Sequence, residues 1–390
     1  MYVAATAIKI RTIKEVATMQ EMTAHERVHN ALEGHPVDRL PATEGFWAET
    51  LVRWRAEGYL GPDEDPIDHF DLDLRRAGGL NCIADLDFEP VVLEETAETI
   101  LRLDGNGASL RRHKLYSTTP EHVDFIVKER TAWEETIKPH LLAVDRRRIP
   151  FGNYREERNK AAEQERHFCW AGMAPFEQMH PMCGHEYMLM GMALDPDWVR
   201  DMVNTYAEFT IRHLDLLFAE EGLPDSIWFY EDMGYKQSPF MSPTMYTEIM
   251  QPGHESLFRY AHDLERKVIV HSCGFVEPLL SGLIEAGMDC LQAMEVKAGM
   301  DLPRIWRNFG KHITFCGNID VRELVSNNPE RVRAEVDCKL RPVLAGGGSY
   351  ILHSDHSIPP DVDYETYTAF LAYGRRLGQL TWPTPLGAAI

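Results

Sequence analysis

Short apolar runs alternate with longer amphipathic segments through the last two thirds of the chain. The apolar runs are rich in β-branched and aromatic residues, as in the Ile-Trp-Phe-Tyr of 227–230 and the Val-Ile-Val of 268–270, and this composition favours buried strands. The segments between them repeat apolar residues with a helical period, as over 196–221. Strands are predicted at 168–172, 226–230, 268–271, 290–295, 313–317 and 349–352. This alternation predicts βα units joined by right-handed crossovers.

Two further strands would close these six into an eight-stranded barrel. One is predicted at 42–46 and the other before a β-hairpin at 98–113, whose turn is the Asp-Gly-Asn-Gly of 104–107. We therefore predict an α/β fold, a TIM (β/α)8 barrel with an N-terminal helical and β-hairpin elaboration. A doubly wound parallel sheet is the alternative. No Gly-x-Gly-x-x-Gly or P-loop run follows a strand, so dinucleotide and P-loop sites lack support.

The chain is expected to form a single barrel domain over 23–390, preceded by an N-terminal extension, residues 1–22, without a strong pattern. Thr23 and Glu26 form a capping-box signature, which predicts a helix over 25–32. A hairpin and helical insertion is predicted at about 85–166, with a helix over 121–142 and a solvated, charge-dense helix over 146–166.

Composition narrows the classes of partner. Sixty-one acidic against forty basic residues give a formal charge of -21, which argues against nucleic acid and anionic membrane surfaces, because both are bound through basic patches. The seven cysteines are scattered singly, so reduced thiols are expected rather than a disulfide framework. No apolar run approaches the ~18 residues of a membrane span, and the N-terminus lacks a signal-peptide core, so we expect a cytoplasmic protein.

Metal-binding or titratable side chains follow five predicted strands in succession. They are Glu231 and Asp232, His271 and Cys273, Glu295, Asp320, and the run His353, Asp355 and His356. Chemistry in a TIM barrel sits at the C-terminal ends of its strands, so these groups predict an active site. A helix cap explains Asp320 as well as a catalytic role does. A local ion pair with Lys297 explains Glu295 equally well, and His353 is expected to be structural or to support the site.

His271 and Cys273 form the most specific pair. Side chains on a strand alternate, so both project to one side where the strand ends, and an imidazole beside a thiol suits Zn²⁺. A core histidine beside an unrelated buried cysteine is the simpler interpretation of this segment alone. The polar ends of the neighbouring strands favour the metal site. The third ligand is expected to be His356 or Asp355, with Glu231 as a further oxygen donor.

The chain resembles the uroporphyrinogen decarboxylase superfamily, in its methyltransferase-like branch rather than among the decarboxylases themselves. The motifs that carry the resemblance run from the N-terminal third to the C-terminus. They are residues 26–28, 34–41, 271–274, 285–289, 295–301, 309–311, 317–320, 346–352 and 358–362. The resemblance implies a TIM barrel. True decarboxylases of the superfamily carry an arginine-rich motif that binds the porphyrinogen carboxylates, whereas here Glu44 stands in that stretch without paired arginines.

The zinc methyltransferases of the superfamily use a His-x-Cys pair and a later cysteine. His271 and Cys273 match the pair, while His356 stands at the later cysteine position. The resemblance therefore implies a zinc site of His271, Cys273 and His356 that is altered in one ligand. It also implies a methyl transfer in which a separate corrinoid protein supplies the cobalamin, because the chain has no Asp-x-His-x-x-Gly motif of its own.

The predicted function is a zinc-dependent methyltransferase that acts between a small methylated substrate and that cobalamin. Methoxylated aromatics are the favoured donors, because the aromatic residues Trp170, Phe176, Trp228, Phe229 and Tyr235 suggest a partly aromatic pocket, which core packing explains at least as well. O-demethylation would need a proton on the departing oxygen, and Glu231, Asp232 or Asp355 is expected to supply it, with Asp320 as a further candidate catalytic residue. A metal-dependent lyase or decarboxylase of a small acid is the alternative, and a non-catalytic ligand-binding barrel is a third, weaker one. The substrate, the direction of transfer and the oligomeric state, with a homodimer as one option, stay open.

Overall fold

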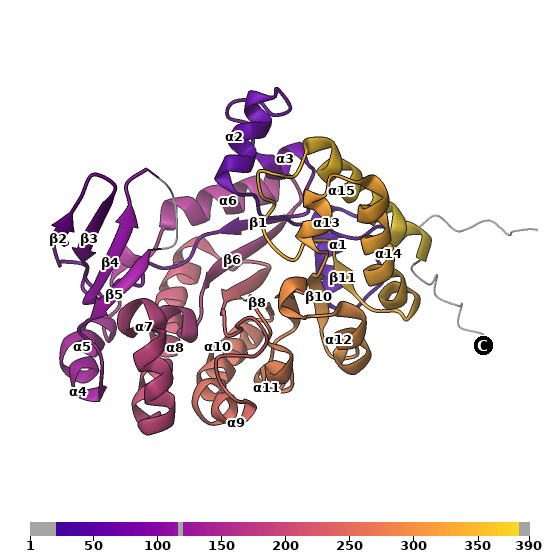
Figure 1. Ribbon diagram of the computed structural model, residues 1–390. Coiled ribbons are helices and arrows are strands. Elements are labelled where there is room, and N and C mark those ends of the chain that lie inside the picture. Colours follow the sequence, from indigo (N-terminus) through magenta and orange to yellow (C-terminus); the bar gives the residue numbers. More distant parts are fainter. Residues whose placement is uncertain (1–20, 116–119, 382–390) are drawn as a thin grey trace, which may run out of the picture.

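The computed structural model describes residues 21–115 and 120–381 and shows an α/β fold built on a curled parallel sheet (Figure 1). The sheet has seven strands in the order β1-β6-β7-β8-β9-β10-β11, and every neighbouring pair is parallel. Its strands are β1 (Leu74–Ala77), β6 (His167–Met173), β7 (Ser226–Tyr230), β8 (Lys267–Ser272), β9 (Cys290–Ala293), β10 (Thr314–Gly317) and β11 (Tyr350–Ile351). Strands β6 to β11 confirm the six predicted strands. Of the predicted N-terminal extension, residues 1–20 lie outside the described residues.

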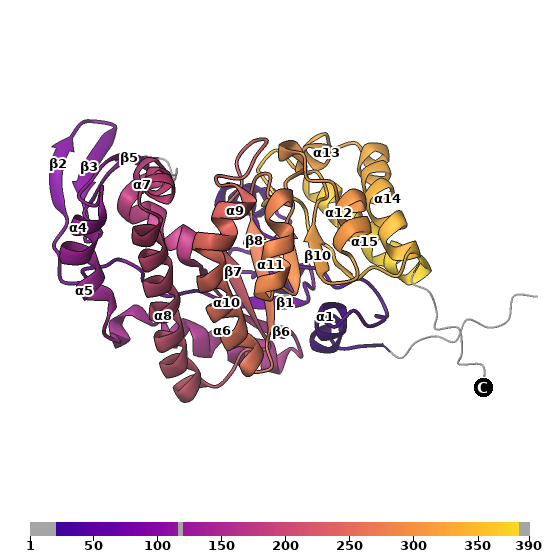
Figure 2. The same cartoon turned by 90° about the horizontal axis from the view of Figure 1, so that it is seen from below.

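Helices cover the outer face of the sheet, and Figure 2 shows several of them side by side in front of the strands. The longer helices are α2 (Ala48–Ala56), α6 (Phe151–Glu163), α7 (Pro175–Leu194), α8 (Pro196–Glu221), α10 (Gln251–Asp263), α12 (Leu302–Phe309), α14 (Pro329–Ala345) and α15 (Tyr364–Thr381). The shorter ones are α3 (Pro66–His69), α4 (Arg130–Ala132), α5 (Lys138–Leu141), α9 (Pro243–Met245), α11 (Leu280–Ala286) and α13 (Val321–Val325). Single 3-10 or π turns are η1 (Trp133–Ile137), η2 (Arg146–Arg148), η3 (Tyr246–Met250), η4 (Glu277–Leu279) and η5 (Val296–Ala298). Among the described residues, no helix is both long and apolar enough to cross a membrane.

Helix α1 (Ala24–Leu32) packs beneath the N-terminal end of the sheet. The predicted capping box is confirmed: Glu26 N donates to Thr23 Oγ1 at 3.1 Å, and Thr23 N donates to Glu26 Oε2 at 2.9 Å. Val28 and Ala31 are buried against inward-facing strand residues, and the hydroxyl of Thr314 donates to the Ala31 carbonyl at 2.8 Å. Because α1 covers this end, the opposite edge of the sheet is the one left for a site.

The predicted first strand, 42–46, contributes isolated bridges rather than a ladder. Ala42 bridges Leu352, and Phe46 bridges Ile358, both in parallel. The Leu352 N–H donates to the Pro41 carbonyl at 2.8 Å, and the Asp73 N–H donates to the Ala42 carbonyl at 2.8 Å. This segment therefore makes backbone hydrogen bonds both to the residue after β11 and to the residue before β1, while the continuous sheet has seven strands.

A second sheet lies beside the first and consists of β2 (Val91–Glu95), β3 (Thr99–Leu103), β4 (Ala108–His113) and β5 (Glu121–Phe125) (Figure 1). The β3–β4 pair is the predicted hairpin. The prediction of a helix over 121–142 was wrong for residues 121–129, because β5 pairs antiparallel with β4 and the first helical residue is Arg130. Phe125 then packs against α7 at Gly184, where a side chain would come within 2.5 Å of the phenyl ring. A solvated helix over 146–166 was also only partly right, since α6 begins at Phe151 and buries Tyr154 and Ala161.

Candidate metal centre

The inward-facing positions of the strands change from apolar to polar at the C-terminal edge of the sheet. Leu74, Trp228, Ile269, Cys290 and Ile351 belong to one buried cluster inside the sheet. The residues two positions further along each chain segment line a single cavity of about 220 Å³, and they are Arg76, Tyr230, His271, Gln292 and His353. Since strand side chains alternate with a period of two, the cavity is the continuation of the core, with polar groups replacing apolar ones.

At one wall of this cavity, His271 and Cys273 lie together as predicted. The Sγ atom of Cys273 is 3.4 Å from Nε2 of His271, and the same nitrogen is 3.4 Å from Oδ1 of Asp232. The Cys273 N–H donates to Asp232 Oδ1 at 2.7 Å, which fixes the carboxylate beside the thiol. One ligand atom from each of the three residues lies within 4.8 Å of the others. The structure thus brings nitrogen, sulfur and oxygen donors to one point.

The orientation of His271 is set by a chain of buried polar side chains behind it. Its Nδ1 hydrogen-bonds to Oε1 of Gln292, the residue paired with His271 in the neighbouring strand β9. Because an amide oxygen only accepts, Nδ1 carries the proton and Nε2 presents its lone pair to Cys273 and Asp232. The amide Nε2 of Gln292 lies 3.5 Å from Nε2 of His353, which in turn is 3.3 Å from Oε1 of Glu44.

Burial controls the charges at this edge. It raises the pKa of Glu44 to about 8 and lowers that of His353 to about 3, so at neutral pH the proton of this pair resides on the carboxyl group. Burial also raises the pKa of Asp232 and of the Cys273 thiol, and the charge of Asp232 raises the thiol further. At Asp232, burial therefore outweighs the opposing charges of His271 and His180, which lower its pKa.

The donor set fits zinc. Zn²⁺ takes thiolate, imidazole and carboxylate ligands, and catalytic sites use three protein ligands with a fourth position for water or substrate. The tautomer of His271, held by Gln292 through the far nitrogen, is the one that a metal ligand needs. A divalent cation would also place positive charge beside the Asp232 carboxyl group and the Cys273 thiol, and its binding would release the thiol proton.

Two other predicted residues line the same cavity without joining the three donors. His356 is exposed, and its ring stacks on Trp47 with 6.1 Å between centroids. Asp355 is buried and accepts hydrogen bonds from the backbone N–H groups of Val296 and Val321, each at 2.8 Å. Burial raises the pKa of Asp355 to about 6. Which residue completes a metal site, and which acts as an acid, stay predictions.

Glu231 and Asp320 do not line the cavity. Glu231 is fully buried and accepts from the N–H groups of Phe176 and Glu177, at the start of α7, and from His254 at 2.6 Å. Asp320 caps α13 and pairs with Arg322 at 2.7 Å. Both carboxylates thus hold helix N-termini in place, the role that was the alternative for Asp320 in the sequence.

The sequence analysis missed Arg76, Tyr230 and Gln292 as cavity residues. All three are at alternate positions of strands whose preceding inward residue is apolar, and that spacing is the signal that would have found them. Glu295 lies close by and accepts from the Gly274 N–H at 3.0 Å, rather than pairing with Lys297 as the alternative supposed.

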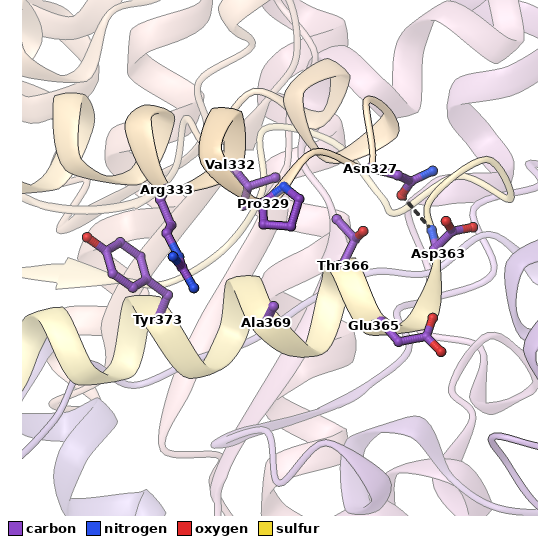
Figure 3. A pocket seen from close by; sticks show the side chains of 9 residues that line it. All are labelled: Asn327, Pro329, Val332, Arg333, Asp363, Glu365, Thr366, Ala369 and Tyr373. Atoms are coloured by element: carbon purple, nitrogen blue, oxygen red, sulfur yellow. Dashed lines mark hydrogen bonds between the residues drawn. The ribbon is translucent and has the colours of Figure 1, made fainter.

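Two further cavities help to delimit the site. One of about 400 Å³ shares Arg76 and Tyr230 with the site cavity and is otherwise lined by residues of β1 and β6 and the loop after β1. The other, of about 230 Å³, lies on the outside between α14 and α15 (Figure 3). It is lined by Asn327, Pro329, Val332, Arg333, Asp363, Glu365, Thr366, Ala369 and Tyr373. It contains none of the predicted site residues.

Comparison with known proteins gives three findings. The family description "Uroporphyrinogen decarboxylase (URO-D)" matches residues 160–377, which is more than half of the 390-residue chain. The methylated-thiol–coenzyme M methyltransferase of Methanosarcina mazei is 26% identical over 163 residues, 41% of this chain and 41% of that protein, so the match spans about two fifths of the relative. A solved structure described as a methyltransferase from Methanosarcina mazei has a TM-score of 0.61 at 16% identity, covering 92% of this chain and 99% of that one. At that identity the likeness supports the fold alone.

Proposed function

Because the chain belongs to the uroporphyrinogen decarboxylase family, we propose that it is a zinc-dependent methyltransferase, which moves a methyl group between a small methylated substrate and the cobalamin of a separate corrinoid protein. The observation that carries the proposal is the approach of His271 Nε2, Cys273 Sγ and Asp232 Oδ1 at the C-terminal edge of the sheet. A metal-binding thiol and imidazole at that edge are what a methyltransferase of this kind requires.

Two features support a small methylated substrate over a porphyrinogen. The site cavity of about 220 Å³ is smaller than the ~300–1,000 Å³ of pockets for drug-sized ligands. A methyltransferase of Methanosarcina mazei that is similar to this chain is named for methylated thiols. An ether or thioether of modest size suits both features.

The groups of this chain would share the work as follows. Zinc held by His271 and Cys273, with Asp232 or His356 as the third ligand, would act as a Lewis acid on the oxygen or sulfur that carries the methyl group. Gln292 keeps the imidazole turned toward the thiol. Asp355, with its pKa raised to about 6 by burial, is suited to protonate the departing oxygen of a methyl ether.

Methoxylated aromatics are the favoured substrates, so the favoured reaction is O-demethylation. Tyr230 lines the cavity and its ring meets that of His271 edge-on, with 5.3 Å between centroids. Such a ring offers an aromatic substrate a packing partner beside the metal ligands. The same wall would also accept a methylated thiol.

The test is methyl transfer to chemically reduced cobalamin, followed by the absorbance of methylcobalamin. We expect methoxybenzenes or methylated thiols to methylate cobalamin when the protein carries zinc, and the rate to fall to background after chelation and to return when zinc is restored. The Cys273→Ser variant, shown to be folded by circular dichroism, should stay near background. Transfer that persists in a folded, zinc-free protein would contradict the proposal.

The alternative function is a metal-dependent lyase that decarboxylates a small acid. It is favoured by one observation, since a carboxyl group with a pKa near 6, that of Asp355, would also protonate the carbanion left by loss of CO₂. Release of CO₂ without any cobalamin in the assay would select this function over methyl transfer.

A further inference from the structure

Arg76 presents a cation to the site that forms no ion pair with any carboxylate of the described residues. It is an inward-facing residue of β1, and its guanidinium lies over the ring of Trp228 at 4.8 Å from the centroid. Its Nη1 donates to the hydroxyl of Tyr230 at 3.4 Å. Within residues 21–115 and 120–381, these are its polar and ring partners, and no carboxylate oxygen lies within ion-pair distance of it.

The neighbouring Arg75 shows how this chain ordinarily treats a buried arginine. Arg75 faces the opposite side of the strand, is fully buried, and pairs with Asp65 at 2.8 Å, Asp68 at 2.5 Å and Glu157 at 3.0 Å. Buried charges are generally paired in this way, because an unpaired one loses its hydration without compensation. Arg148, which is also buried, has no carboxylate partner and donates to backbone carbonyl groups instead. Arg76 is half-buried and, among the described residues, has neither kind of partner, since its hydrogen bond goes to the Tyr230 hydroxyl.

The carboxyl groups that share the cavity edge do not supply a partner. Glu44 is buried, accepts hydrogen bonds from Gly45 and Ser354 through backbone and hydroxyl donors, and lies beyond ion-pair distance of Arg76. Burial raises the pKa of Glu44 to about 8, although the charge of Arg76 opposes the rise. Asp355 uses its two oxygens on backbone N–H groups of Val296 and Val321. The guanidinium of Arg76 thus remains available to a ligand.

We propose that Arg76 binds an anionic group, a carboxylate or a sulfonate, on the substrate of this site. Its planar fork of N–H donors matches the two oxygens of such a group. This inference rests on the proposed function for the methyl-bearing end of the substrate, and it adds the opposite end. Tyr230 touches both Arg76 and His271, so a ligand held by Arg76 extends along Tyr230 toward His271 and Cys273. The substrate class is then a small methylated acid, with a methoxylated aromatic acid as its aromatic form.

The experiment measures binding by calorimetry, without turnover, in the zinc-loaded protein. The probes are para-methoxybenzoate, its uncharged isostere para-methoxybenzamide, para-methoxybenzenesulfonate and (methylthio)acetate. The variants are Arg76→Gln and Arg76→Lys, with Arg155→Gln as a control for the loss of one positive charge, because Arg155 is an exposed residue that pairs with Glu221 and does not line the cavity. Thermal unfolding by circular dichroism verifies that each variant is folded.

We expect wild-type protein to bind at least one anionic probe more tightly than the amide. Arg76→Gln should weaken that anionic probe about 10- to 100-fold, the usual range for a lost charged hydrogen bond, and leave the amide unchanged. Arg76→Lys should fall between the two, and Arg155→Gln should match wild type. Preference between benzoate and sulfonate identifies the acid. If Arg76→Gln weakens the binding of the acid and of the amide equally, Arg76 only holds Tyr230 and Trp228 in place, and the proposal is overturned. Failure of every anionic probe to bind would overturn it as well.

The outcome is separable from that of the proposed function. Binding of the anion through Arg76 without any methylation of cobalamin would retain the anion site and remove the methyl transfer. Methyl transfer from neutral and anionic donors alike, with no change of KM in Arg76→Gln, would retain the methyl transfer and remove the anion site.

Discussion

The two ends of the parallel sheet each gather three groups that could hold a metal, and they differ in how those groups are charged. At the N-terminal end, His25, His167 and Asp225 have ligand atoms within 4.8 Å of one another, as do Asp232, His271 and Cys273 at the C-terminal end. The number of possible ligands therefore does not distinguish the two clusters, whereas the charges around them do.

At the N-terminal end the acid and base compensate each other. His25 Nε2 lies 3.3 Å from Asp225 Oδ1, and the hydrogen bond to Asp225 raises the pKa of His25. Burial alone would raise the pKa of Asp225, but the His25 hydrogen bond and the charge on His167 lower it overall. Arg158 and Arg166 line the adjoining cavity and disfavour a further cation.

At the C-terminal end, burial raises the pKa of both Asp232 and Cys273, and the imidazole of His271 is turned by Gln292 so that its lone pair faces them. The comparison teaches that the metal centre is marked by acids whose pKa burial raises despite the nearby bases, beside an imidazole whose unprotonated nitrogen faces them. The donor types alone do not mark it.

The largest expected effect is on bound zinc. His271→Ala and Cys273→Ala should each lose the zinc of about one ion per chain expected for a single catalytic site, while His25→Ala should retain it. The reason is that, of these two clusters, the C-terminal one includes a thiol. Elemental analysis of the purified, folded proteins measures this. Loss of zinc in His25→Ala equal to that in His271→Ala would erase the distinction between the two ends.

The second-largest expected effect identifies the third zinc ligand. Asp232→Asn should weaken zinc binding by more than the ~10- to 100-fold that follows loss of a group behind a metal ligand. His356→Ala should weaken it less, since His271 Nε2 already lies 3.4 Å from Asp232 Oδ1 while His356 is exposed and stacked on Trp47. Competition with a chromogenic chelator gives both affinities. The reverse order would make His356 the third ligand, as the family resemblance implies.

These residues also show how far the sequence leads. The β-branched run of β8 and the capping box of α1 are local signals, because burial of a strand and satisfaction of a helix N-terminus depend on adjacent residues. The same holds for the proximity of His271 and Cys273, which lie on one strand end. The beginning of the helix predicted at 121–142 was wrong because the structure there depends on a non-local contact: β5 forms by pairing with β4.

Side-chain contacts between different strands could not be predicted from the sequence. Gln292 supports His271 only because the register of β8 and β9 places them opposite each other, and Arg76 reaches Tyr230 from a strand that is not its neighbour. Glu231 and Asp232 are adjacent in the chain, yet one caps α7 from a buried position and the other faces the thiol. Nothing in their local pattern separates these two roles.

A smaller effect tests the chain of polar groups behind the imidazole. Gln292→Leu should weaken zinc binding about 10- to 100-fold, the range for loss of a group that orients a metal ligand, without removing any donor atom. Gln251→Leu, in which a buried amide on α10 is removed instead, serves as the matched control and should bind zinc like wild type. An unchanged affinity in Gln292→Leu would mean that the His271 tautomer is fixed without it. The same competition assay applies.

The smallest effect concerns stability at the N-terminal end. The pKa of His25 is raised in the folded protein by Asp225, so its pairing stabilises the fold fully below the unfolded value of ~6.5 and is lost as the pH rises through the folded pKa. His25→Ala should therefore lower the melting temperature more at about pH 5.5 than at about pH 8.5, by an amount corresponding to less than ~1 kcal/mol because the pair is partly exposed. His35→Ala, at an exposed position, should show no such difference between the two pH values. Thermal unfolding at both pH values measures the difference in melting temperature between His25→Ala and wild type. A difference that does not change with pH would mean that His25 and Asp225 do not compensate each other's charge. That compensation is the property that sets this end of the sheet apart from the metal centre.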